Sequence, residues 1–123
     1  MGNDLTAPLE EMARALIAHD ALRLRELLLE WRRAAGNPSL LPPPRSEDAR
    51  VRIAAAALAE LFAEREDVPA PAWTGREGSF AEPFFALASA DRLQSLRELC
   101  RREAPAALRR HGILAPANFL ELL

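Results

Sequence analysis

Apolar side chains recur along this chain at the three- and four-residue spacing of an α-helix, and prolines and glycines divide the pattern into segments. The spacing predicts helices at about residues 7–18, 20–35, 47–65, 90–103, 105–111 and 116–122. No stretch alternates long enough to predict a strand, and Ile113 with Leu114 is too short to count. We therefore expect an all-α fold, a compact bundle of about five or six helices with an ordered loop rich in proline and aromatic residues. The 123 residues suffice for one such domain, residues 1–123, and are too few for a second.

The segment at about 47–65 has the most regular pattern. Its wide apolar face carries Val51, Ala54, Ala55, Leu58, Leu61 and Phe62, and a second, narrow face carries Ala56, Ala59 and Ala63. Small residues on the narrow face would let another helix approach closely. Ser46, followed by Glu47 and Asp48, predicts the start of the helix, because carboxylates are favourable at the positive end of the helix dipole. We expect this helix at the centre of the fold, with Val51, Leu58 and Phe62 buried.

The first two predicted helices are separated by His19 and Asp20. Thr6 is a candidate N-cap for the first helix and Asp20 for the second. The apolar stripes of the two helices differ in phase, which favours a helical hairpin and leaves a single kinked helix as the alternative. In the second helix, Leu22 and Leu29 lie at about 150° from the main stripe. Either this helix is packed between neighbours, or Leu22 and Leu29 form an interface for self-association or for another protein.

Residues 67–82 contain prolines and glycines that interrupt helix throughout, and aromatic residues cluster in and just after this segment. A loop that leaves this much apolar area in water is unfavourable. The segment is therefore expected either to cover the core or to be the docking site of a partner protein. The residues predicted to bind that partner are Trp73, Arg76, Phe80, Phe84 and Phe85, since interfaces are enriched in aromatic residues and arginine.

The predicted helix at 90–103 has Asp91 and Gln94 in the spacing of a capping box. Its apolar stripe consists of Leu93, Leu96, Cys100 and Ala104. Cys100 lies on this stripe and has no histidine beside it, so we expect a small core residue and not a nucleophile.

Composition narrows the function classes. The formal net charge is −2, and all sixteen basic residues are arginine, which excludes lysine-based chemistry. The single cysteine cannot form an intrachain disulfide, the N-terminus shows no secretory signal, and no apolar run is long enough to span a bilayer, so we expect a cytoplasmic protein.

The sequence predicts no catalytic residue, no cofactor site and no metal site. His19 with Asp20 is expected to form a turn and a helix cap, since nothing before His19 could complete a metal site. His111 is expected at a helix C-terminus, where a partly charged imidazole suits the dipole. Glu60 and Glu64 lie one turn apart, and we expect both to be solvated.

Nucleic-acid binding is the alternative function. Between positions 91 and 111 the chain has six arginines and only three acidic residues. The same stretch is predicted to form a helix, a short break and a second helix, which is the order of elements in a helix-turn-helix motif. These arginines are Arg92, Arg97, Arg101, Arg102, Arg109 and Arg110. The short second helix and the acidic remainder of the chain make nucleic acid the less favoured partner.

The last third of the chain contains a tryptophan, a Pro-Phe-Phe segment before a helix, an Ala-Pro start followed by an Arg-x-His-Gly-Ile-Leu stretch, and a closing Phe-Leu. The residues concerned are Trp73, Pro83, Phe84, Phe85, Ala104, Pro105, Leu108, Arg109, His111, Gly112, Ile113, Leu114, Phe119 and Leu120. In this it resembles the C-terminal end of small uncharacterised bacterial helical proteins, although those have an aromatic residue at the position of Leu108 and asparagine at that of Gly112. The resemblance implies no catalytic residue. It implies a partner-binding role beside a nucleotidyltransferase-like protein, in a toxin–antitoxin-like pair, and we expect a non-catalytic interaction or regulatory module.

Overall fold

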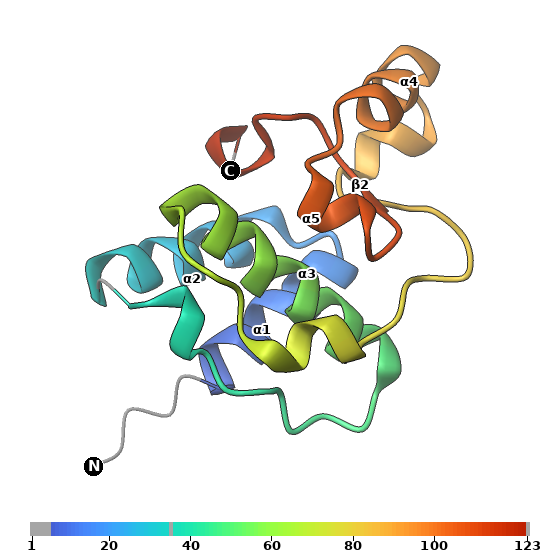
Figure 1. The fold of residues 1–123 in the computed structure, drawn as a ribbon. Helices are drawn as coiled ribbons and strands as arrows, with labels where there is room; N and C mark the ends of the chain where they lie inside the picture. The colour runs from blue at the N-terminus through green and yellow to red at the C-terminus, as the bar shows by residue number, and fades with distance from the viewer. Residues whose placement is uncertain (1–5, 35, 123) are drawn as a thin grey trace.

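The computed structural model describes residues 6–34 and 36–122, and this part of the chain is mostly helical (Figure 1). The α-helices are α1 (Thr6–Ile17), α2 (Ala21–Ala34), α3 (Ala49–Glu66), α4 (Gln94–Glu103) and α5 (Ala106–Arg109). Short 3₁₀-helices are η1 (Pro38–Leu40), η2 (Ala72–Arg76), η3 (Ala88–Asp91) and η4 (Phe119–Leu122). Two short strands, β1 (Phe84–Phe85) and β2 (Ile113–Leu114), complete the described elements. The expected all-α class is confirmed.

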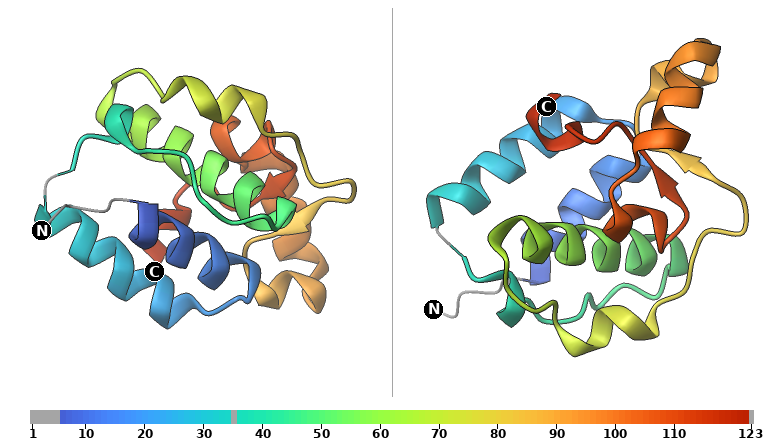
Figure 2. Two further views of the ribbon diagram at one scale, coloured as in Figure 1. Left: turned by 90° about the horizontal axis from the view of Figure 1, so that it is seen from below. Right: turned by 45° about the horizontal axis from the view of Figure 1, so that its top comes forward.

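Helix α3 lies at the centre of the molecule, between the α1–α2 pair on one side and the segment that contains η2 on the other (Figure 2). Val51, Leu58 and Phe62 are at most 4% exposed, as expected for a central helix. The alanines of the narrow face, Ala56, Ala59 and Ala63, are buried as well. Helix α3 begins two residues later than predicted. Asp48 is its N-cap and accepts a hydrogen bond from the backbone N–H of Arg50, whereas Ser46 accepts one from Asp48.

Helices α1 and α2 form the expected hairpin. The side chain of Asp20 caps α2 by accepting a hydrogen bond from the backbone N–H of Arg23. Helix α1 is described from Thr6 onward, and the predicted cap at Thr6 depends on a side chain outside the described ones. Leu24, Leu27, Leu28 and Trp31 of α2 are buried, but Leu22 and Leu29 are 67% and 39% exposed. The expectation that α2 packs between neighbours on both sides is therefore wrong.

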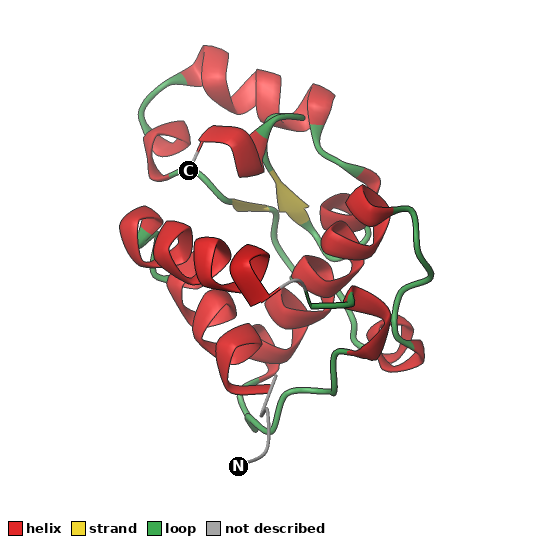
Figure 3. Ribbon diagram, turned by 90° about the vertical axis from the view of Figure 1, so that its left-hand side faces the viewer, coloured by secondary structure: helices red, strands yellow, loops and turns green. Residues whose placement is uncertain are grey.

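The two strands were not predicted. They pair in parallel, with Phe84 beside Ile113 and Phe85 beside Leu114, and are short compared with the helices (Figure 3). Each supplies only two residues, so neither leaves an alternating pattern that sequence analysis can detect. Residues 67–82 also differ from the expectation of unbroken irregular structure, because η2 forms within them.

Helix α4 projects from one end of the molecule (Figure 1) and packs on a second, small cluster of buried residues that contains Cys100, Ala104 and Leu114. Cys100 is fully buried, which confirms its place in a core, and burial raises the pKa of its thiol. The predicted capping box is wrong: α4 begins at Gln94 without a side-chain cap, and Asp91 belongs to η3. Leu93 is 53% exposed and lies outside the buried stripe.

The two last predicted helices are shorter than expected. The segment 105–111 forms only the four-residue α5, and 116–122 forms the 3₁₀ turn η4. Phe119 and Leu120 of η4 nevertheless point inward and are at most 5% exposed. They join the main hydrophobic cluster with residues of α1, α2, α3 and α5.

Candidate binding surface

Three aromatic rings stack where β1 passes the turn between α1 and α2. The centroids of His19 and Phe84 are 5.1 Å apart with 6° between the ring planes, and those of Phe80 and Phe84 are 5.3 Å apart at 23°. The guanidinium carbon of Arg50 lies 5.6 Å from the Phe80 centroid and 5.9 Å from that of Phe84. His19 and Arg50 are exposed, and the two phenylalanines are partly buried against the main cluster. We call these four residues the aromatic stack.

A hollow of about 420 Å³ opens beside the aromatic stack. It is lined by Arg50, Ile53, Ser79, Phe80, Ala81, Glu82, Pro83 and Phe84. Its lining joins apolar and aromatic groups to two charged side chains of opposite sign. This combination is typical of surfaces that receive an anchoring side chain from a partner.

His19 reaches the stack because of its backbone conformation. It follows the end of α1 with φ of 57°, which turns the chain toward α2. Its ring Nε2 lies 2.8 Å from the carbonyl oxygen of Phe85, which fixes the ring beside β1. His19 lies in a turn, as predicted, but its contact with Phe84 was not predicted, since the two residues are far apart in the chain.

The turn formed by His111 and Gly112 holds the segment that carries Phe80 and Phe84. The backbone N–H of Phe80 donates to the His111 carbonyl over 3.0 Å, and that of Phe84 donates to the Gly112 carbonyl over 2.9 Å. His111 Nδ1 lies 2.7 Å from the Gly78 carbonyl oxygen, which can only accept, so Nδ1 carries the proton. These three hydrogen bonds hold the segment that carries Phe80 and Phe84 against the His111 turn.

Glu60 lies beneath this turn and is only 7% exposed, so the expectation that it is solvated is wrong. Its Oε1 accepts from Arg110 Nε and Nη2 over 3.2 and 3.1 Å and lies 3.1 Å from His111 Nε2. Burial alone would raise the pKa of Glu60. The neighbouring side chains of His111, Thr74 and Arg110 favour the charged form, outweigh burial and hold the pKa of Glu60 below its usual value of 4.5. Glu64, one turn further along α3, is exposed as expected.

The structure divides the five predicted partner-binding residues among three places. Phe80 and Phe84 lie together in the aromatic stack. Phe85 points to the other side of β1, against the small cluster below α4. Trp73 is partly buried in η2 and donates from its indole N–H to the Leu41 carbonyl over 2.7 Å, and Arg76 is exposed at the end of η2. The missed members of the surface are His19 and Arg50, which no local motif marks.

The arginines of the alternative function are partly engaged within the protein. The side chain of Arg97 donates to the carbonyl groups of Ala90 and Asp91, and that of Arg109 to the carbonyl of Arg101. Arg110 binds Glu60. Arg92, Arg101 and Arg102 are exposed.

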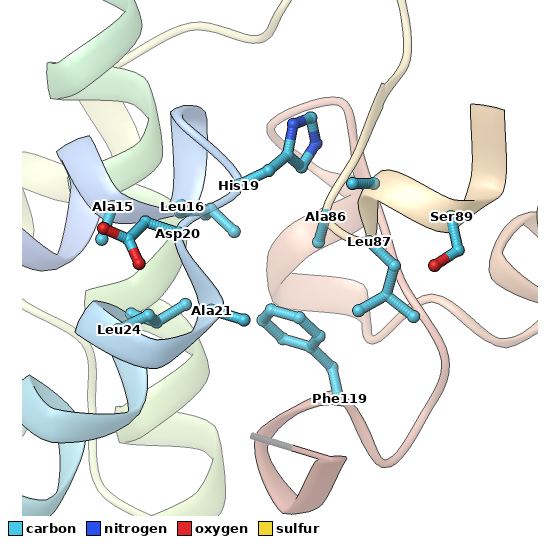
Figure 4. A pocket seen from close by; sticks show the side chains of 11 residues that line it. Ala15, Leu16, His19, Asp20, Ala21, Leu24, Ala86, Leu87, Ser89 and Phe119 are labelled. Carbon is cyan, nitrogen blue, oxygen red and sulfur yellow. The ribbon is translucent and has the colours of Figure 1, made fainter.

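A smaller pocket of about 190 Å³ lies between the α1–α2 turn and Phe119 (Figure 4). Its lining is largely apolar, with Leu16, Leu24 and Leu87 among its residues. The ring of His19 points away from Phe119, toward β1, and Asp20 is occupied as the cap of α2. The polar groups around this pocket therefore do not converge on its interior.

Within residues 6–34 and 36–122, no three His, Cys, Asp or Glu side chains gather closely enough to hold a metal ion. No helix in that part of the chain is both long and apolar enough to cross a membrane. The chain matches no known protein family, no curated protein and no solved structure with which it was compared.

Proposed function

We propose that the protein is a non-catalytic interaction or regulatory module that binds another protein through the aromatic stack and its hollow. The observation that carries the proposal is the fixed, partly exposed pair of Phe80 and Phe84 beneath Arg50. Rigid aromatic side chains provide contact area at little cost in conformational entropy, and aromatic and arginine side chains dominate binding energies at interfaces.

Pre-organisation supports this function. A partner that docks on the stack need not order the rings, because His111 and Gly112 already hold the segment in place. The hollow lies directly beside the rings, so an anchoring side chain would contact Phe80, Phe84 and Ile53 together.

Nucleic acid fits the same surface less well. Single-stranded nucleic acid stacks its bases on exposed aromatic faces. His19 and Phe80 both lie within stacking distance of Phe84, which leaves less of this ring free to stack on a base. Among the arginines of α4 and α5, three are engaged in contacts within the chain.

Affinity capture from an extract of the native host, followed by mass spectrometry, tests the proposal. The bait is compared with Arg50→Glu, which reverses the charge over the rings and keeps the backbone hydrogen bond from residue 50 to Asp48. The matched control is Arg102→Glu, an exposed arginine on α4 outside the aromatic stack. We expect a protein that the bait and the control capture and that Arg50→Glu loses, with all three baits melting at similar temperatures.

A partner lost equally with both variants would point to general attraction by arginine and overturn the assignment of the stack. Titration with fluorescent genomic fragments at low salt tests the alternative. Tight binding that weakens steeply with salt would replace the proposed function with nucleic-acid binding.

A further inference from the structure

Given the proposed function, the charges around the aromatic rings indicate what kind of segment of the partner protein binds there. Each phenylalanine of the segment 80–85 has a guanidinium over its ring. Arg50 lies over Phe80 and Phe84, and on the other side of β1 the guanidinium carbons of Arg97 and Arg101 lie 5.7 and 5.5 Å from the Phe85 centroid. Three cations thus flank three aromatic rings along one short stretch of chain.

Among the described residues, Arg23, Arg52, Arg65 and Arg110 pair with carboxylates, whereas Arg50, like most arginines of the chain, does not; Arg50 is the one of these that lies over the aromatic stack and lines the hollow. Arg52, two residues further along α3, lies 3.5 Å from Glu77, and Arg110 lies 3.1 Å from Glu60. Among the described residues, no carboxylate lies within ion-pair distance of the Arg50 guanidinium. Its planar fork of donors is therefore available to a carboxylate from outside.

The hollow adds a requirement for an apolar group. Ile53, Phe80, Ala81, Pro83 and Phe84 supply most of its wall, and Arg50 stands at the same wall. Glu82 also lines it and opposes a second acidic group there. One carboxylate beside one apolar side chain satisfies both the arginine and the wall.

We propose that the partner binds through an acidic peptide segment in which an apolar side chain enters the hollow and a neighbouring Asp or Glu carboxylate accepts two hydrogen bonds from Arg50. The phosphates of a nucleic acid would also attract Arg50. They would leave the apolar wall of the hollow in contact with water, however, which makes the peptide the better fit.

Selection from a random peptide display library on the immobilised full-length chain tests this inference. We expect enriched peptides to share an Asp or Glu next to an apolar residue. The best peptide, synthesised with a fluorophore, should bind the Arg50→Glu variant at least about tenfold more weakly, because hydrogen bonds between charged groups contribute this much or more. Arg102→Glu should change its affinity by less than about twofold, since exposed charges outside the contact contribute little.

Four results would overturn the inference. The first two are enrichment of neutral or basic peptides and absence of any enriched motif. The others are equal affinity of the peptide for the wild type and for Arg50→Glu, and competition between the peptide and a single-stranded oligonucleotide for the same surface. If the native partner is still lost with Arg50→Glu in affinity capture, the proposed function stands and only the acidic peptide is wrong; if that dependence is absent too, both fail.

Discussion

Glu60 shows how a buried charge can be tolerated in so small a protein. Its carboxylate is removed from water, which is costly, and the compensation comes from two segments: Thr74 in η2, and the adjacent Arg110 and His111 in the turn after α5. These two segments are far apart in the chain, so Glu60 ties η2 and the His111 turn to α3. It contributes to the position of the aromatic stack without touching it.

Glu60 should therefore make the protein sensitive to acid. Its pKa is lower in the folded state than in the unfolded chain, so its contribution to the free energy of unfolding is fully present above about pH 4.5 and is lost as the pH falls through the folded pKa. We expect Glu60→Gln to lower the free energy of unfolding at neutral pH by about 1–3 kcal/mol. Urea titrations between about pH 7 and pH 3 should show a smaller loss of stability for the variant than for the wild type. Parallel curves for the two proteins would mean that Glu60 is not the responsible group.

The short elements β1 and β2 depend on Gly112. Its φ of +78° lies in the left-handed region, and a Cβ there would be 2.6 Å from Ser79 Oγ and 3.1 Å from the backbone of Phe80. The glycine thus allows residues 79–80 to approach the His111 turn closely and to form the hydrogen bonds that hold the aromatic segment.

Gly112→Ala should destabilise the protein by about 1–3 kcal/mol, through backbone strain and the clash with Ser79. Gly75→Ala is the control, since a Cβ at Gly75 meets nothing within 4 Å. Chemical denaturation should show little change for the control, within about 0.5 kcal/mol. Equal losses for both variants would contradict the role assigned to Gly112. The Gly112 variant should also bind the partner more weakly, because Phe80 and Phe84 lose their support.

The predictability of the elements follows the range of the interactions that form them. Helix α3 and the cap at Asp20 were predictable, since a regular apolar stripe and an N-cap residue act within a few positions. The start of α4 was not, because Asp91 is drawn into η3 and leaves the expected capping box unformed. The pairing of β1 with β2 and the burial of Glu60 depend on residues distant in the chain, and no local pattern encodes them.

The same limit applies to the candidate site. Aromatic composition alone brought Phe80 and Phe84 into the prediction. It also brought in Trp73, which the fold places in η2 with its indole bonded to Leu41. Arg50 and His19 enter the site only through the tertiary packing of α3 and of the α1–α2 turn on β1.

For the whole molecule, the exposed leucines of α2 bear on the oligomeric state. Leu22 and Leu29 are seven residues apart and lie on the same exposed face, which keeps self-association as a prediction. Leu22→Glu combined with Leu29→Glu should convert a dimer into a folded monomer in multi-angle light scattering. Leu40→Glu, at another leucine that is 71% exposed, is the control and should leave the mass unchanged. A monomeric wild type would exclude this interface.

The bond between His19 and Phe85 has a consequence for the solubility of the molecule. The backbone N–H groups of Phe84 and Ala86 both point toward β2, so the carbonyl of Phe85 between them points to the open edge of the two-stranded sheet. An open edge of this kind can recruit a strand from another chain and so start aggregation. The imidazole of His19 is hydrogen-bonded to the carbonyl group with which an incoming strand would have to pair. This side chain therefore prevents a third strand from adding to the sheet beside β1.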